Sequence, residues 1–221
     1  MFLGHFAAAL GGKRAAPRAS LGLLFAAAQL PDLLWPAFVL AGWERVRIAP
    51  GDTAFTPLAF VHYPWSHSLA LVLLWGALLG GGYALLARDR RGGVVLAALV
   101  LSHWVLDAVT HRPDLPLAPG GTARVGLGLW NSVPLTIVIE ALLFAAGVAL
   151  YLRSTRPAAR AGTVGLWALL AFLVVVYVGN VFGPPPPSET AVAWATLSMW
   201  LLVAWAAWVD GRRAPTDVAG A

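Results

Sequence analysis

The sequence contains no cysteine, which excludes disulfide bonds and metal sites built from thiolates. It contains only two methionines, so a copper site with soft thioether ligands is not expected. Charged residues are also scarce, because they make up 11% of the chain, against about 25% in an ordinary soluble domain. A metal site in this protein must therefore use His, Asp or Glu side chains.

Two common sequence motifs are missing as well. There is no glycine-rich phosphate-binding loop, and there is no G-x-S-x-G motif. Nucleotide binding through such a loop and serine-hydrolase chemistry therefore have no support. We also find no internal repeat.

Apolar residues fill most of the chain instead. They make up 59% of it, and the mean hydropathy is +0.75. Long apolar runs lie at 20–42, 66–87, 92–110, 133–152, 163–182 and 189–209, and each is long enough to cross a bilayer as a helix. The run at 1–10 is too short to cross at ~1.5 Å per residue. We predict an all-α, polytopic transmembrane bundle of about six spans, preceded by a short N-terminal half-helix.

The basic residues alternate between the two ends of these spans. The clusters at 13–18, 88–91, 153–160 and 212–213 fall on one side, and the four remaining arginines fall on the other. By the positive-inside rule, this predicts a multi-pass inner-membrane protein with both termini in the cytoplasm. The net charge of +5 then reflects topology, and no nucleic-acid partner is expected. The expected partners are the lipid bilayer and a small-molecule or lipid substrate.

One stretch concentrates polar residues at the end of an apolar run. His103, Asp107 and His111 are spaced i, i+4, i+8 in SHWVLDAVTH, which puts them on one face of a helix. Such groups are costly inside a membrane unless something pairs with them. A divalent metal is the simplest partner, and a structural His–Asp hydrogen bond is the alternative. His111 could be a ligand, a second-shell group or a proton shuttle.

The other polar residues of the spans are placed to meet this face. Asp32 follows Pro31, which loosens the first span, and a buried carboxylate there needs a metal or a His partner. His67 opens the second span, where Ser66 is a candidate helix N-cap. His5 lies in the N-terminal half-helix, and Glu140 lies inside the fourth span. Glu140 could be a ligand, a general base, or a partner of Asn131 or of the loop after His111.

The order of four short motifs resembles the YdjM-like family. They are Gly4-His5, Leu30-Pro31-Asp32, His62-x4-His67-Ser68 and Ser102-His103-x3-Asp107-x2-Thr110. The resemblance covers roughly the first half of the chain. Members are described as inner-membrane, metal-dependent hydrolases, distantly similar to the zinc-dependent phospholipase C and single-strand nuclease superfamily.

The resemblance implies a set of site residues. The metal ligands would be His5, Asp32, His67, His103 and Asp107, with His62 near the site. In this chain Asp32 is followed by Leu33-Leu34, where the family often has a second carboxylate.

From these observations we expect a metal-dependent hydrolase. The metal would be zinc or manganese, the substrate an ester or phosphoester, and the proton acceptor Asp32, Asp107 or Glu140. Residues 1–152 would form the metal-site core, 153–209 two scaffold helices, and 210–221 a disordered tail. Two alternatives are a proton- or ion-coupled transporter, and a non-catalytic scaffold with a His–Asp network.

Overall fold

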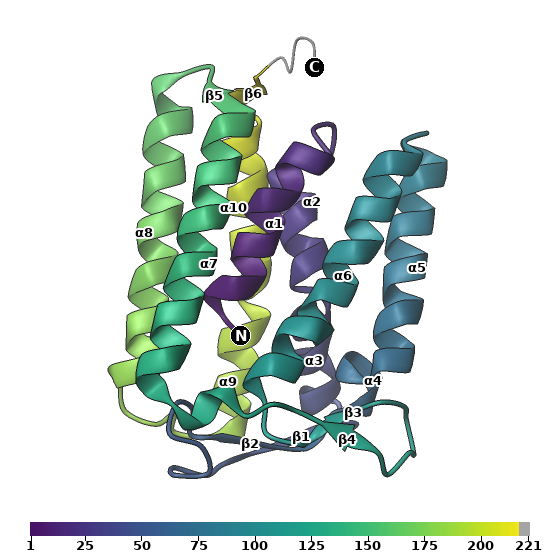
Figure 1. The fold of residues 1–221 in the computed structure, drawn as a ribbon, viewed down its shortest axis with the longest axis vertical. Helices are drawn as coiled ribbons and strands as arrows, with labels where there is room; N and C mark the ends of the chain where they lie inside the picture. The colour runs from purple at the N-terminus through teal and green to yellow at the C-terminus, as the bar shows by residue number, and fades with distance from the viewer. Residues whose placement is uncertain (217–221) are drawn as a thin grey trace.

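The computed structural model describes residues 1–216 as a bundle of roughly parallel and antiparallel helices (Figure 1). The helices are α1 (Leu3–Ala15), α2 (Leu21–Ala28), α3 (Leu30–Leu40), α4 (Pro64–His67), α5 (Leu69–Leu86), α6 (Arg90–Thr110), α7 (Val133–Ser154), α8 (Arg160–Phe182), α9 (Glu189–Leu197) and α10 (Met199–Asp210). The short strands are β1 (Arg45–Ile48), β2 (Leu58–His62), β3 (Leu115–Pro116), β4 (Arg124–Val125), β5 (Thr155–Pro157) and β6 (Arg213–Pro215), and η1 (Leu129–Asn131) is a 3-10 turn. The predicted all-α polytopic fold is confirmed.

The expected spans correspond to these helices. Among the described residues, α5, α6, α7, α8 and the α9–α10 pair are long and apolar enough to cross a membrane. The pair α2 and α3, bent by 59°, is a candidate sixth span. The bend falls just before Pro31, which cannot donate a backbone hydrogen bond and stands in the first turn of α3. This break places the start of α3, with Asp32, inside the bundle.

The N-terminal helix α1 is a half-helix, as expected, but it begins inside the bundle. Met1 lies about half-way along the bundle and is buried. The end of the bundle that carries β5 and β6 also carries the α1–α2 and α5–α6 turns (Figure 1). Since α1 starts inside the bundle, Met1 reaches neither end of it, and the cytoplasmic location of both termini stays a prediction.

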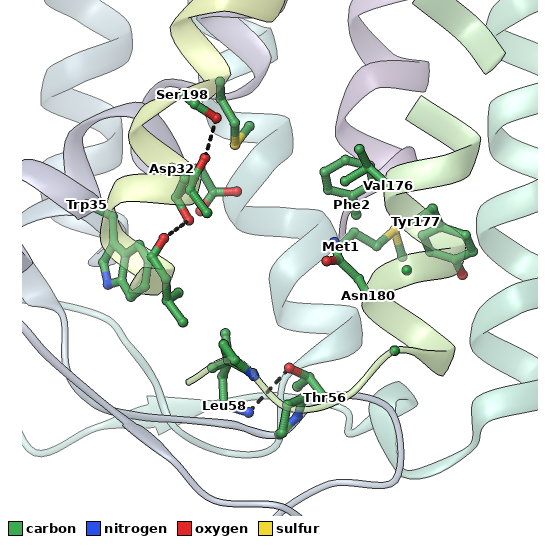
Figure 2. A pocket seen from close by; sticks show the side chains of 18 of the residues that line it. Met1, Phe2, Asp32, Trp35, Thr56, Leu58, Val176, Tyr177, Asn180 and Ser198 are labelled. Carbon is green, nitrogen blue, oxygen red and sulfur yellow. Dashed lines mark hydrogen bonds between the residues drawn. The ribbon is translucent and has the colours of Figure 1, made fainter. Parts of the chain in front are cut away.

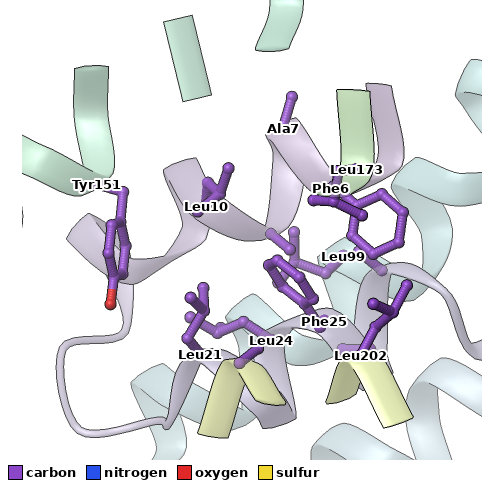
Figure 3. Close-up of a cluster of buried hydrophobic side chains, with 14 of the residues drawn as sticks. Phe6, Ala7, Leu10, Leu21, Leu24, Phe25, Leu99, Tyr151, Leu173 and Leu202 are labelled. Atoms are coloured by element: carbon purple, nitrogen blue, oxygen red, sulfur yellow. The ribbon is translucent and has the colours of Figure 1, made fainter. Parts of the chain in front are cut away.

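The main hydrophobic core surrounds α1. Figure 3 shows Phe6 and Leu10 of α1 packed against Leu24 and Phe25 of α2, and Leu99 of α6 belongs to the same cluster. On its other side α1 packs along α7. This core fixes the half-helix between three spans, so a side chain of α1 can be held at a defined depth.

Polar contacts close the end of the bundle that carries β5 and β6. The ammonium of Lys13 lies 2.7 Å from the carboxylate of Asp210, which also accepts a 2.9 Å hydrogen bond from the Tyr151 hydroxyl. Strand β6 pairs antiparallel with β5. In place of the disordered tail expected from Asp210 onward, residues 210–216 are ordered by these contacts. The remainder of that expected tail, 217–221, lies outside the described residues.

Two small hairpins cover the opposite end of the bundle. Strands β1 and β2 form one, and β3 and β4 form the other. A second, smaller core beneath them includes Trp35, Val46, Tyr63 and Leu115. The loops therefore form a cap over the end of the bundle where α3 and α4 lie.

Candidate metal centre

Helix α6 supplies the first two residues of the site. His103 and Asp107 are buried and lie one turn apart, with His103 Nε2 3.1 Å from Asp107 Oδ2. This is the geometry that the i, i+4 spacing predicts. His111, the next residue in that series, follows the last residue of α6 and adopts an extended backbone. The helix therefore ends before the third member of the series can continue the stripe.

Helix α1 brings His5 to the same carboxylate. Its Nε2 lies 3.1 Å from Asp107 Oδ1, and its ring stacks on that of His103 with 3.8 Å between ring centroids. The amino group of Met1 lies 2.6 Å from the same Oδ1 and 3.4 Å from the hydroxyl of Thr110. Both oxygens of Asp107 are thus in contact with nitrogen atoms of the surrounding helices.

Asp32 and His67 complete the cluster from the opposite side. His67 Nε2 lies 3.3 Å from Asp32 Oδ1 and 3.8 Å from Asp107 Oδ2. His103 Nε2 lies 3.8 Å from Asp32 Oδ1. The structure therefore brings together all of the residues that the resemblance implied as ligands. Within the described chain they form two overlapping groups whose ligand atoms lie within 4.8 Å of one another, His5–His103–Asp107 and Asp32–His67–His103.

A backbone carbonyl fixes the orientation of the His103 ring. The break between α2 and α3 leaves the carbonyl of Ala28 at the end of α2, and it lies 2.8 Å from His103 Nδ1. A carbonyl can only accept, so Nδ1 carries a proton, and in the neutral imidazole Nε2 then carries the lone pair. Nε2 is buried and has no hydrogen-bond partner despite its proximity to Asp107. A buried lone pair of this kind is suited to binding a cation.

A second chain of hydrogen bonds orients His67. Ser66 donates its hydroxyl to Glu44 Oε2 at 2.6 Å and lies 2.7 Å from His67 Nδ1. Since the hydroxyl proton goes to Glu44, Nδ1 of His67 is the donor to Ser66, and in the neutral imidazole the Nε2 lone pair faces Asp32. Helix α4 begins at Pro64 and not at Ser66. The expected N-cap role of Ser66 is therefore replaced by this link between Glu44 and His67.

Glu44 is the residue that sequence reasoning missed. It lies in the loop after α3, is 1% exposed, and accepts backbone hydrogen bonds from Trp65 and Ser66 at 2.7 and 2.9 Å. Burial raises the pKa of the Glu44 carboxyl, against the hydrogen bonds from Ser66 that lower it. The sequence offered no local signal for this role, because Glu44 stands beside Arg45 in a loop after the first span.

Glu140 has a structural partner instead of a place in the cluster. Its Oε2 accepts hydrogen bonds from the backbone N–H groups of Phe2 and Gly4, at 3.0 and 3.2 Å. It therefore satisfies donors at the start of α1, a position where a helix leaves N–H groups free. These contacts give Glu140 a role that the sequence did not suggest, an anchor for the helix that carries His5.

His111 belongs to a neighbouring network in the loops at the hairpin end of the bundle. Its Nδ1 lies 3.0 Å from Asp114 Oδ1, and the Tyr63 hydroxyl donates to the same oxygen at 2.8 Å. Burial raises the pKa of Asp114, but the hydrogen bonds from His111, Tyr63 and Arg112 outweigh it and hold that pKa below the ordinary value. His111 is thus a neighbour of the cluster, with its Nδ1 committed elsewhere.

The two remaining candidates lie apart from the cluster. His62 pairs with Arg45 across the β1–β2 hairpin. Asn131 is exposed at the end of η1. Neither has a described contact with the His/Asp cluster or with Glu140.

A cavity of about 850 Å³ adjoins the cluster. Asp32, His67, Asp107 and His111 line one part of it, and α8, α9 and α10 line another. Figure 2 shows Asp32 on one side of this space and Val176, Tyr177 and Asn180 of α8 on the other. The helices expected to be scaffold therefore also form a wall of the cavity beside the site.

One protein family matches most of the chain. The model of the YdjM inner membrane protein family matches residues 1–183. The chain belongs to the YdjM family. The match extends past the first half of the chain and includes α7 and α8 as well as every helix that carries the cluster. Family membership and the apolar helices identify an inner-membrane protein. No curated protein and no solved structure matches this YdjM-family chain.

Proposed function

We propose that this YdjM-family protein is a membrane-embedded hydrolase that uses a divalent metal against an ester or phosphoester bond. The observation that carries the proposal is the convergence of three imidazoles and two carboxylates from α1, α3, α4 and α6, with Nε2 of His103 buried and unpartnered. Such a cluster inside a membrane span is costly unless it serves a cation or a reaction.

The residues fit a divalent ion in number and chemistry. Asp32 and Asp107 offer it two carboxylates, and the amino group of Met1 contacts that of Asp107. Imidazole nitrogen and carboxylate oxygen are common ligands of zinc, and carboxylates also suit manganese. The Nδ1 atoms of His67 and His103 are held by Ser66 and by the Ala28 carbonyl, which is the arrangement of partners that orients metal-binding histidines.

The geometry favours a single ion. His103 belongs to both groups of ligand atoms, and its Nδ1 is committed to Ala28. Only Nε2 is left, and one imidazole nitrogen binds one ion at a time. The two overlapping groups of candidate ligands therefore surround one ion-binding position, with up to five residues around it.

The solvent exposure of the two carboxylates suggests a different role for each. A divalent ion held here would polarise the scissile group and make a water acidic enough to attack near neutral pH. Asp107 is almost fully buried, and nitrogen atoms of His5 and His103 contact its carboxylate oxygens. Its role would be to hold the cation and to fix the positions of these two rings. Asp32 is 30% exposed through its side chain and lines the cavity. Asp32 is therefore the residue placed to accept the proton of an attacking water.

We also propose the orientation that the basic residues indicate. The clusters at 13–18, 88–91, 153–160 and 212–213 belong to the end of the bundle with β5 and β6 (Figure 1). By the positive-inside rule this end faces the cytoplasm. The two hairpins and the cavity beneath them then lie toward the outer face.

Hydrolysis by the purified protein tests the proposal. Metal-loaded protein should cleave a carboxylic ester or phosphoester reporter, and chelation should stop the reaction. At saturating metal, Asp32→Asn is expected to lower kcat about 100-fold or more, because a positioned general base contributes ~10²–10⁴-fold. Asp52→Asn is the control, since Asp52 pairs with Arg112 in the outer loops. Unchanged turnover in Asp32→Asn would contradict the assigned role.

The hydrogen bond from His67 to Ser66 gives a second prediction. Ser66→Ala is expected to weaken zinc affinity by about 10–100-fold, the usual effect of removing a group that orients a ligand. Ser68→Ala is the matched control, because the Ser68 hydroxyl is buried close by and has no hydrogen-bond partner. Competition with a chromophoric chelator measures both affinities. Equal zinc affinities in the two variants would show that Ser66 does not orient a zinc ligand.

A further inference from the structure

We propose that the cavity beside the His/Asp cluster holds an acyl chain of a membrane lipid, so that the substrate is a lipid ester. This inference rests on the proposed hydrolase function and narrows its substrate class. It assigns to α8, α9 and α10 the role of binding the apolar part of that substrate.

The cavity is lined by two chemically different kinds of side chain. Its polar lining includes Asp32, His67 and Asp107, and its apolar lining includes Val176, Met199 and Leu202. A ligand that fits both kinds of lining needs a polar, hydrolysable group joined to an apolar chain. The volume of about 850 Å³ lies within the ~300–1,000 Å³ typical of small-molecule sites. Burying a chain along apolar walls is favourable in proportion to the area removed from water.

The cavity also reaches the lipid-facing surface of the bundle. Its walls include Phe172 of α8 and Leu201 of α10, which are 44% and 72% exposed. Both belong to helices that are long and apolar enough to cross the membrane, so their exposed faces contact acyl chains of the bilayer. A lipid can therefore place a chain in the cavity without leaving the hydrocarbon layer.

Gly179 leaves room on the α8 wall. It lines the cavity, and a Cβ added there would meet no described atom within 4 Å. A Cβ at this position therefore displaces no neighbouring atom, and we expect a larger side chain to fill cavity space. Gly81 on α5 is equally open by the same criterion and does not line the cavity. The two glycines therefore form a matched pair for blocking the cavity and for control.

Photo-crosslinking in vesicles tests whether a lipid acyl chain occupies the cavity. The full chain would be reconstituted with a phospholipid that carries a diazirine in the middle of one acyl chain, irradiated, and mapped by peptide mass spectrometry. We expect adducts on Val176 and Met199, in excess of those on exposed residues of α5. Gly179→Leu should lower the adducts on Met199 at least about tenfold, while Gly81→Leu should leave them unchanged. A diazirine fatty acid run in parallel shows whether the head group is needed.

The outcomes separate this inference from the hydrolase proposal. Adducts spread evenly over the lipid-facing helices, or unchanged by Gly179→Leu, would overturn the acyl-chain site even if the protein binds zinc. Cavity adducts that persist in a wild-type protein without any metal affinity would support the lipid site and count against the hydrolase. Crosslinks from Met199 to a second copy of this chain would also overturn the inference, because they would identify a protein as the occupant.

Discussion

Zinc added to the metal-free wild-type protein is expected to raise its free energy of unfolding by about 4 kcal/mol when free zinc exceeds Kd about 1,000-fold. The physical reason is that the folded chain gathers five candidate ligand residues that lie far apart in the sequence. His103→Ala should abolish most of this stabilisation, because Nε2 of His103 belongs to both groups of candidate ligand atoms. Thermal unfolding in detergent, with and without zinc, measures the difference.

The control for that experiment replaces His62, another histidine of the motifs that resemble the YdjM-like family. His62 lies on β2 and pairs with Arg45 across the hairpin, away from the cluster. His62→Ala should therefore keep the full response to zinc. If His103→Ala and His62→Ala respond to zinc alike, the ion binds elsewhere and the cluster is a structural His–Asp network.

Replacing Gly147 on α7 by leucine is expected to disturb both the fold and the site. A Cβ at Gly147 would lie 2.7 Å from the Cα of Ala7, a contact with backbone that no side-chain rotation relieves. Overpacking of a tight contact costs ~1–3 kcal/mol, and more when backbone must move. Helix α1 would be pushed from α7, and His5 would move with it. We therefore expect lower thermal stability together with weaker zinc binding.

Gly82→Leu on α5 is the control for this second substitution. Gly82 is also a glycine inside a membrane span, but an added Cβ there meets nothing within 4 Å. It should leave unfolding temperature and zinc affinity close to those of the wild type. Wild-type zinc affinity in a folded Gly147→Leu protein would show that the position of α1 does not control the site.

The sequence predicted the cluster where local geometry or the family motifs determine it. His103 and Asp107 share a helix, so their spacing alone places them together. Asp32 was marked by Pro31, whose missing N–H produces the observed bend. His5 and His67 were expected near this face from their places in the apolar runs, and the resemblance assigned them as ligands. No local pattern predicts how α1 and α4 approach α6.

The supporting residues were harder to predict because they act through tertiary contacts. Glu44 reaches Ser66 from a loop 22 positions away, and Glu140 reaches the start of α1 from 136 positions away. Hydropathy identified α8 and the α9–α10 pair as spans, but not the side of each that faces the cavity. The strand pairing at 213–215 was missed because three-residue strands leave little periodicity to read.

The metal content of the wild-type protein tests the central claim most directly. The chain is purified in detergent without chelators, equilibrated with zinc and manganese, and passed through a desalting column. Elemental analysis should then find about one ion per chain, because both groups of candidate ligands share His103. A folded protein that retains neither metal would contradict the account, and the transporter reading, tested by pH-dependent flux in vesicles, would then take its place.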